Sequence, residues 1–369
     1  MTDWTRLARP SLRGLTPYHP GLTRDELKER LGLDHLEPLN WNEDLFGPPQ
    51  EVLDAAAAEL QNAAFYPERA YADFRDAAAA ALGVPADSVI PAHGAQALIA
   101  SLAAAFLEPG RTAVVPAVTY GLYAHVSTAV GARVVQAPMP GVDLDLAAIA
   151  ARARSEDANV VWVCDPNNPT GSLIDPAGWA EFLADLPPDC VVVADEAYMD
   201  FADPAVRTDR LRDVAEGRPV IVIRSFSKSF GLAGLRLGIG IADPAVARLL
   251  DVVQEPFNVN RAALAAGRAA ADLGGFLDRR RAEVAEARDA LREALAREGL
   301  VTHPSHANFV LVELGVDDRP VCDALLARGI LVRPGTGLGL PGTARVTVAP
   351  APLMARVAAM IAEEVERAK

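Results

Sequence analysis

After the apolar run Val220-Ile221-Val222-Ile223, the chain reads Arg224-Ser225-Phe226-Ser227-Lys228-Ser229-Phe230-Gly231-Leu232-Ala233-Gly234-Leu235-Arg236. A lysine among small hydroxyl residues after a buried strand is a candidate reactive amine. Desolvation or nearby cations lower the pKa of such an amine and free it to attack a carbonyl. Ser225, Ser227 and Arg236 can hold a phosphate by hydroxyl donation and by the guanidinium fork. An ordinary lysine in a surface loop is the alternative, and the stretch favours a reactive lysine beside an anion site.

Size and composition limit the classes of protein that this chain can represent. Its 369 residues exceed the roughly 250 to 300 at which single cores stop growing, so two lobes are expected. Hydrophobic residues at 51% with 23% charged are typical of globular proteins, and no apolar run approaches the roughly 20 residues of a membrane span. The net charge of −14 argues against a nucleic-acid partner. With no export signal and no paired cysteine framework, we expect a cytoplasmic protein that binds neither membrane nor nucleic acid.

Short apolar runs alternate with helical patterns from about Pro49 onward. Their near-continuous Val and Ile content is typical of strands covered on both faces, and helices between them favour parallel pairing. The candidate strands begin near Ser88, Ala113, Arg133, Val160, Val191, Val220 and Leu237. We therefore predict an α/β fold with a main sheet of seven mostly parallel strands.

The same patterns divide the chain into three regions. Residues 1–43 look irregular and carry turn signals such as Thr16-Pro17, so we interpret them as an N-terminal arm that joins the small domain. Residues 44–285 form the predicted large domain. Alternating charges from Phe276 to Ala296 indicate a solvated connecting helix. Residues 286–369 alternate strands and helices and form a smaller C-terminal α+β domain.

Polar side chains follow two further strands. Asp195 ends the run Val191 to Ala194, and in open α/β sheets such a residue faces the ligand crevice. An acid opposite a pyridine nitrogen keeps that nitrogen protonated, and Tyr198 can donate to a neighbouring ring oxygen. The amide of Asn168 can bind a cofactor oxygen or a substrate carboxylate. A strand-end aspartate can equally cap a helix or bind a metal. Together with Lys228 and its anion site, these residues describe a site for pyridoxal 5'-phosphate.

Two other strand-end turns complete this picture. Ala95 and Gln96 open a helix, where free backbone N–H groups can hold a phosphate. Tyr120 follows another strand and can stack on a flat ring. His303 and His306 are spaced to share a helical face, but a proline lies between them and no third ligand is evident. We expect no metal site.

These residues, taken in order, resemble the fold-type-I pyridoxal-phosphate-dependent aminotransferases, most closely those that act on histidinol phosphate. The resemblance covers nearly the whole chain. Its motifs are Leu15-Thr16-Pro17-Tyr18, Tyr66-Pro67-Glu68, Thr119-Tyr120-Gly121, Pro166-Asn167-Asn168-Pro169-Thr170-Gly171, Asp195-Glu196-Ala197-Tyr198, Ser227-Lys228 with Gly231 to Arg236, Ala307-Asn308-Phe309, and Val332-Arg333-Pro334 with Arg345-Val346-Thr347-Val348.

The resemblance implies a role for each position. Lys228 bonds the cofactor and carries the proton between substrate and cofactor. The implied cofactor-binding residues are Asp195 at the ring nitrogen, Asn168 and Tyr198 at the phenolic oxygen, Tyr120 on the ring, Ala95, Gln96, Ser225, Ser227 and Arg236 at the phosphate, and Tyr66 from the second subunit of a homodimer.

Substrate recognition follows in the same way. Arg345 resembles the arginine that binds the substrate α-carboxylate, with Asn168 beside it. Arg333 and Tyr18 resemble the group that recognises the substrate side chain, here an imidazole and a phosphate. The implied reaction converts L-histidinol phosphate and 2-oxoglutarate to imidazole-acetol phosphate and L-glutamate, a step of histidine biosynthesis.

Three departures from the family pattern lie close to the implied pocket. Val348-Ala349-Pro350 replaces the usual Val-Gly-Thr, Gln96-Ala97 replaces an acidic or serine residue followed by glutamate, and Asn42-Glu43-Asp44-Leu45 replaces Asn-Glu-Asn-Pro. An aromatic or specialised biosynthetic aminotransferase is therefore an alternative. A decarboxylase of the threonine-phosphate type would use the same cofactor residues, and the sequence does not separate it from a transaminase.

Overall fold

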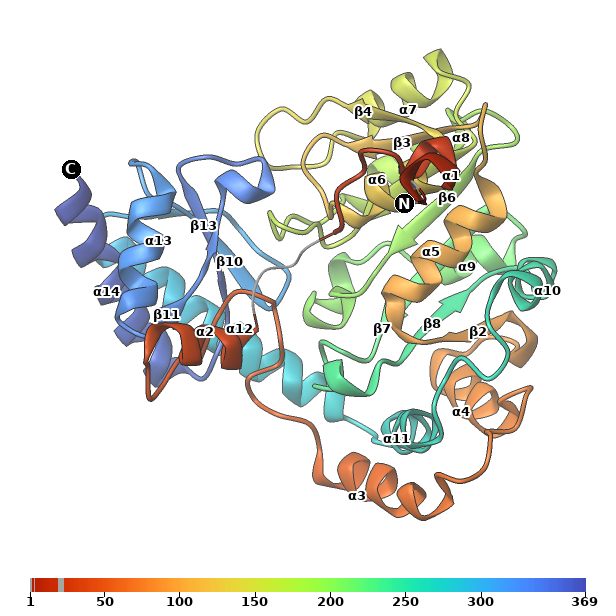
Figure 1. Cartoon of the computed structure of the whole chain (residues 1–369), viewed down its shortest axis with the longest axis horizontal. Helices are drawn as coiled ribbons and strands as arrows, with labels where there is room; N and C mark the ends of the chain where they lie inside the picture. The colour runs from red at the N-terminus through yellow and green to blue at the C-terminus, as the bar shows by residue number, and fades with distance from the viewer. Residues whose placement is uncertain (1, 3, 19–22) are drawn as a thin grey trace.

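The computed structural model describes residues 2, 4–18 and 23–369, and its centre is a seven-stranded sheet (Figure 1). The strands lie in the order β2 (Val89–Ala92), β8 (Gly238–Ile241), β7 (Val220–Ser225), β6 (Val191–Asp195), β5 (Val160–Cys164), β3 (Thr112–Pro116) and β4 (Arg133–Ala137). All neighbours are parallel except β8, which is antiparallel to β2 and β7. The predicted α/β fold is confirmed.

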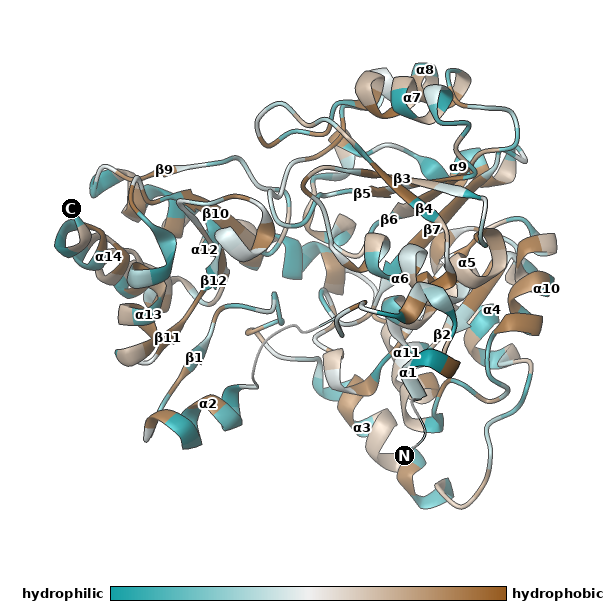
Figure 2. Cartoon of the chain, turned by 45° about the horizontal axis from the view of Figure 1, so that its top comes forward, coloured by the Kyte–Doolittle hydropathy of each residue, from teal (hydrophilic) through white to brown (hydrophobic). Residues whose placement is uncertain are grey.

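Helices cover both faces of this sheet, as its unbroken apolar strands require. Figure 2 shows the hydrophobic strands enclosed between helices of mixed hydropathy. One face packs against α3 (Gln50–Glu59), α4 (Ala72–Leu82), α7 (Leu146–Ser155), α8 (Pro176–Ala184), α9 (Arg210–Ala215) and α11 (Arg261–Ala271). The other packs against α5 (Gly94–Phe106), α6 (Leu122–Val130) and α10 (Pro244–Val253).

The C-terminal part of the chain forms a second layer with its own core. Its antiparallel sheet has the order β12 (Arg333–Pro334), β13 (Thr343–Thr347), β10 (Phe309–Glu313) and β9 (Val301–Thr302). Three helices pack on this core, namely α12 (Phe276–Arg297), α13 (Asp318–Ala327) and α14 (Ala351–Ala368). The sheet and these helices lie beside the large sheet in Figure 1.

The N-terminal region is more regular than its sequence suggests. It contains α1 (Trp4–Leu7) and α2 (Arg24–Leu31), where a reciprocal capping box between Thr23 and Glu26 satisfies the free N–H groups of the first turn. Strand β1 (Glu37–Pro38) then pairs in parallel with β11 (Ile330–Leu331) and so attaches this region to the C-terminal layer. The expectation of an irregular arm was wrong for α2.

Helix α12 connects the two layers, and the expectation that it is simply a solvated helix was wrong. One side of it is buried at Val284, Leu291 and Leu295. Arg280 is also buried and pairs with Asp44. The boundary that we propose at residue 285 falls inside this helix, which therefore contributes to both layers.

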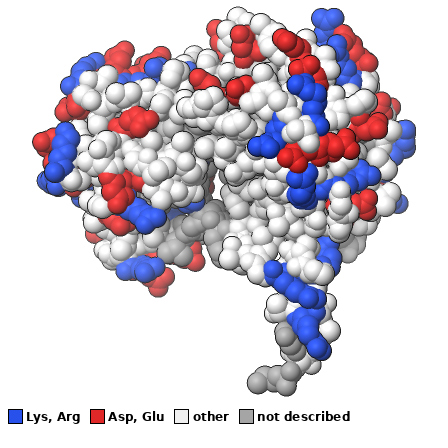
Figure 3. All heavy atoms as spheres, turned by 90° about the horizontal axis from the view of Figure 1, so that it is seen from above, with Lys and Arg blue, Asp and Glu red and all other residues white. Residues whose placement is uncertain are grey.

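Short 3₁₀ helices occupy several of the connections. They are η1 (Pro10–Leu12), η2 (Leu60–Asn62), η3 (Ala86–Ser88), η4 (Met199–Phe201), η5 (Pro204–Val206), η6 (Ala233–Leu235) and η7 (Thr336–Leu338). Within the described residues, every helix is too short or too polar to cross a bilayer. On the face seen in Figure 3, acidic and basic side chains are interspersed.

Candidate active site

Lys228 lies just past the carboxyl end of β7, where the sheet faces the C-terminal layer. Its Nζ donates to the main-chain oxygens of Trp41 at 3.0 Å and Asn42 at 2.8 Å. Burial lowers the pKa of Lys228 to about 8, and the Arg345 guanidinium acts in the same direction while Glu43 opposes it. A free amine is therefore accessible near neutral pH, as the chemistry of a nucleophilic lysine requires.

Asp195 ends β6, the strand next to β7, and its side chain is completely enclosed. One carboxylate oxygen accepts the hydroxyl of Tyr123 at 2.7 Å, and the other accepts the N–H of Ala197 at 3.1 Å. Burial raises the pKa of Asp195 to about 6, while these two hydrogen bonds lower it in part. The carboxylate is thus ionised at neutral pH and fixed in direction, as a partner for a protonated ring nitrogen must be.

A polar cluster joins the loop after β5 to the C-terminal layer. The Tyr198 hydroxyl accepts the amides of Asn42 at 3.1 Å and Asn168 at 3.5 Å. The amide oxygen of Asn168 accepts the guanidinium of Arg345, which also donates to the main-chain oxygen of Asn40. The structure therefore brings Asn168, Tyr198 and Arg345 together across the boundary between the two layers.

Glycines make room for the turn that opens α5. Gly94 has φ +78, and a Cβ there would lie 2.6 Å from the guanidinium of Arg236. A Cβ on Gly238 would lie 2.6 Å from the main-chain nitrogen of Ala95. These contacts place Arg236 and strand β8 directly against the first turn of α5, where free N–H groups favour an anion. The donor set fits a phosphate group.

The two serines of the predicted phosphate site are both buried. The N–H of Ser227 donates to Oγ of Ser225 at 3.2 Å, which orients that hydroxyl within the turn. Burial beside a positively charged turn is a favourable position for donors to a phosphate.

Aromatic side chains lie next to the turn that opens α5. The Tyr120 hydroxyl accepts the amide of Gln96 at 2.7 Å, and this bond ties the ring to the α5 turn. Tyr18 lies edge-on to Tyr120, with ring centroids 6.0 Å apart, and to His125 at 5.9 Å. The segment that carries Tyr18 therefore reaches the large sheet and lies against these aromatic side chains.

Two arginines occupy neighbouring strands of the C-terminal sheet. Arg333 in β12 and Arg345 in β13 are directly opposed in the antiparallel register. Burial lowers the pKa of Arg345 to about 10, and Arg333 adds to this shift. Two guanidinium groups at opposed positions are a geometry that suits carboxylate or phosphate groups.

Tyr66 is the predicted site residue that the structure leaves outside this cluster. It is 79% exposed, and its ring stacks on Phe257 at 4.9 Å. In this chain it lies on the surface, so a role in catalysis requires a second subunit.

Sequence reasoning missed two residues that the structure places at the centre of the site. Tyr123 lies in the first turn of α6, three positions after Tyr120, which precedes that helix. Asn42 has φ +54 and bridges Tyr198, Lys228 and Thr347. The position of Tyr123 in the same strand-end motif as Tyr120 was a signal for the first, and the tolerance of asparagine for left-handed backbone was a signal for the second.

Known proteins agree with this geometry. The model of the family described as "Aminotransferase class I and II" matches residues 34–361. The chain belongs to the aminotransferase class I and II family. A histidinol-phosphate aminotransferase of Symbiobacterium thermophilum is 39% identical over 92% of this chain and 93% of its own length. One of Geobacillus thermodenitrificans is 36% identical over 92% and 93%.

Solved structures agree with the family. Histidinol-phosphate aminotransferase from Sinorhizobium meliloti, in complex with pyridoxal 5'-phosphate, matches with a TM-score of 0.89 at 27% identity over 97% of each chain. A variant of Thermus thermophilus aspartate aminotransferase at 23% identity shares the fold, with a TM-score of 0.84. The prediction of a fold-type-I, pyridoxal-phosphate-dependent aminotransferase is confirmed for this member of the aminotransferase class I and II family.

Proposed function

We propose that this aminotransferase transfers the amino group of L-histidinol phosphate to 2-oxoglutarate and yields imidazole-acetol phosphate and L-glutamate. The opposed pair Arg333 and Arg345 carries the proposal, because it offers one cation to the phosphate of histidinol phosphate and two cations to the two carboxylates of glutamate and 2-oxoglutarate. The names of the relatives at 34 to 39% identity support the same substrate.

Pyridoxal phosphate, when bound, supplies an electron sink that stabilises negative charge at the substrate α-carbon. In our proposal Asp195 faces the ring nitrogen, Asn168 and Tyr198 bind the phenolic oxygen, and Tyr120 lies on the ring. The phosphate is held by the turn at Ala95 and Gln96 with Ser225, Ser227 and Arg236. The glycine contacts described above support this cradle, because a side chain at Gly94 would collide with Arg236 and one at Gly238 would collide with the main chain of Ala95.

Lys228 performs the proton transfer in this proposal. Its lowered pKa suits a general base near neutral pH. The hydrogen bonds of Nζ to Trp41 and Asn42 hold the amine close to the sheet when it is not bonded to the cofactor.

We assign substrate binding to the arginines of the C-terminal sheet and to Tyr18. Arg345 binds the α-carboxylate of glutamate and 2-oxoglutarate with Asn168 beside it. Arg333 and Tyr18 bind the phosphate and imidazole of histidinol phosphate. The contact of Tyr18 with Tyr120 supports this position, because it keeps the ring next to the proposed cofactor residues.

We also propose a cytoplasmic homodimer. The exposed apolar side chains Leu60, Phe65 and Tyr66, together with Phe257, support a subunit interface in which Tyr66 reaches the partner's site. The three cysteines are free and buried, which suits a reducing compartment.

A panel of amino donors tests the substrate. The holoenzyme is mixed with histidinol phosphate, histidinol, phenylalanine or tyrosine, and conversion of the cofactor is followed by its absorbance. Histidinol phosphate should react at least about tenfold faster than any other donor, since a charge-assisted hydrogen bond contributes about 1.5 to 3 kcal/mol. Faster reaction of phenylalanine or tyrosine would favour an aromatic aminotransferase, and carbon dioxide without glutamate would indicate a decarboxylase.

A further inference from the structure

Three adjacent strands each end in a loop that carries a proposed cofactor residue. Asn168 follows β5, Asp195 ends β6, and Lys228 follows β7. Main-chain pairing continues one residue beyond the strands, because the N–H of Asp165 donates to the carbonyl of Asp195 at 2.9 Å. Beyond these residues, contacts other than strand pairing must fix the distances between the loops.

A buried chain of ions lies behind these loops, and we call it the ion chain. Its members, in order of contact, are Asp165, Arg210, Glu196, Arg224 and Asp200. They come from the loop after β5, from α9, from the loop after β6, from β7 and from η4. The ion chain therefore connects all three loops.

Arg210 is the cation between the first two loops. It donates to Asp165 at 2.7 Å and to Glu196 at 2.9 Å, and its side chain has no exposed surface. Its guanidinium also lies 4.1 Å from the ring centroid of Trp179. The other oxygen of Asp165 accepts the N–H of Ile174 at 2.9 Å, which closes the loop that contains Asn168.

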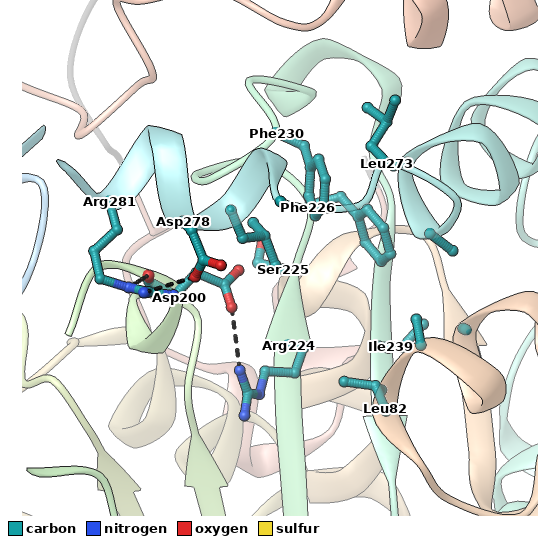
Figure 4. A pocket seen from close by; sticks show the side chains of 16 residues that line it. Leu82, Asp200, Arg224, Ser225, Phe226, Phe230, Ile239, Leu273, Asp278 and Arg281 are labelled. Atoms are coloured by element: carbon teal, nitrogen blue, oxygen red, sulfur yellow. Dashed lines mark hydrogen bonds and ion pairs between the residues drawn. The ribbon is translucent and has the colours of Figure 1, made fainter. Parts of the chain in front are cut away.

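Arg224 continues the connection to the lysine loop. It donates to Glu196 at 2.7 Å and to Asp200 at 3.3 Å, and Asp200 accepts the hydroxyl of Ser229, next to Lys228, at 2.6 Å. Figure 4 shows Arg224 directed at Asp200 beside the cavity that these residues line with Phe226.

A stability role alone explains this arrangement poorly. Buried ion pairs seldom stabilise a fold more than well-packed apolar residues of the same volume, because the charges must be desolvated. Desolvation would lower the pKa of Arg210, but the carboxylates of Asp165 and Glu196 outweigh it and raise that pKa. What a guanidinium that bridges two carboxylates adds is a fixed distance and direction between its partners.

We propose that Arg210 is a positioning residue that sets the spacing between the Asn168 loop and the Asp195–Tyr198 loop for the pyridoxal phosphate ring. The proposal rests on the cofactor roles given above and names a residue that does not touch the cofactor. It concerns cofactor binding alone, so it is independent of which amino donor reacts.

The test replaces Arg210 by methionine, which keeps an apolar stem against Trp179 and removes both ion pairs. The dissociation constant for pyridoxal phosphate should rise at least about tenfold. The circular dichroism of the visible cofactor band should weaken, because it reports the orientation of the ring. Arg212→Met on the same helix is the matched control, since Arg212 is exposed and pairs with Glu216 at the surface. It should leave both readouts within about twofold.

A second variant separates an effect on the position of the loops from an effect on the stability of the fold. Arg210→Met leaves Asp165 and Glu196 buried without their cation, so it lowers the unfolding temperature. Adding Asp165→Asn removes one of these charges and should restore much of that temperature in the cofactor-free protein. The cofactor dissociation constant should stay raised. Recovery of both quantities, or an unchanged dissociation constant in Arg210→Met, would overturn the proposal.

Should Arg210→Met fail to fold, Arg210→Lys supplies the same readouts, because one ammonium cannot reproduce both bidentate directions. An intermediate loss of affinity and of the circular dichroism signal is then expected. Wild-type values for both would count against Arg210 as a positioning residue.

Discussion

At the scale of single residues, the site depends on ionisable groups whose pKa values are shifted by burial. Burial brings the pKa of Lys228 down to about 8 and that of Asp195 up to about 6. The two shifts leave an amine that can lose a proton near an acid that stays ionised at neutral pH. Groups with pKa values moved apart by their surroundings are typical of catalytic centres.

Asp195 should cost stability when no cofactor is bound. Its folded pKa lies above the ordinary 3.8, so the folded state binds more protons between about pH 4 and 6. Stability therefore falls as the pH rises through that window. Asp195→Asn should remove this slope and raise the free energy of unfolding of the cofactor-free protein at pH 7 by about 1 to 3 kcal/mol.

Urea unfolding of the cofactor-free protein at several pH values measures this effect. Asp143→Asn is the control, because Asp143 is exposed and should change neither the slope nor the stability. The same Asp195→Asn change should weaken cofactor binding. A variant as pH-dependent as the wild type would contradict the assignment of the shifted group.

Arg333 should distinguish phosphorylated from non-phosphorylated donors. Arg333→Ala should cost histidinol phosphate about 1.5 to 3 kcal/mol in kcat/KM and leave histidinol nearly unchanged, because only the first loses a charge-assisted hydrogen bond. Arg297→Ala, on the exposed face of α12, serves as the control. An equal loss for both donors would refute this role.

At the scale of elements, the strands of the large sheet were predictable and the connections were not. Runs such as Val220 to Ile223 identify buried strands because both faces are apolar. The two-residue strands β1 and β12 leave no periodic pattern, since tertiary pairing alone defines them. Arg280 belongs to a helix that looks solvated by charge, yet its pairing with Asp44, far away in sequence, buries it.

The site divides in the same way. Residues within strand-end motifs, such as Asp195 and Lys228, were predictable because the chemistry and the end of a parallel strand coincide. The residues that hold these side chains in position were not predictable. Arg210 lies 14 positions from Glu196 and 45 from Asp165 in sequence, so only the fold brings the three together.

The contact between β8 and α5 gives a prediction at this scale. A methyl group at Gly238 would meet the main chain of Ala95 at 2.6 Å, so Gly238→Ala should displace the first turn of α5. We expect the affinity for pyridoxal phosphate to fall at least about tenfold, the loss of roughly one charged hydrogen bond. Fluorescence titration of the cofactor-free protein measures it.

Gly234→Ala is the matched control for this change. Gly234 has no atoms within 4 Å of the added position, so its variant should bind the cofactor as the wild type does. Unchanged affinity in Gly238→Ala would show that the turn tolerates displacement and would contradict the proposed phosphate cradle.

At the scale of the whole molecule, two layers meet at the site, and each contributes chemistry. The large sheet supplies Lys228 and Asp195, while the C-terminal sheet supplies Arg333 and Arg345. Helix α12 spans both layers, and β1 ties the N-terminal region to the second. The residues that we propose for the cofactor lysine and ring nitrogen and those that we propose for substrate anions therefore lie on different sheets.

The proposed subunit interface is testable by mass. Phe65→Glu places a charge among exposed apolar side chains and should shift the protein from dimer to monomer in sedimentation analysis. Val301→Glu, on the C-terminal layer, also places a charge at an exposed apolar residue and should leave the mass unaltered. A wild-type protein that sediments as a monomer would contradict the interface and the role of Tyr66.

The central claim is that one amine, that of Lys228, bonds the cofactor aldehyde. Borohydride reduction of the holoenzyme fixes that bond, and peptide mass spectrometry then locates the modified lysine. The account predicts a single pyridoxyl group on the peptide that contains Lys228 and none in Lys228→Ala. A reduced adduct on Lys28 or Lys369, or the same labelling in Lys228→Ala, would contradict it.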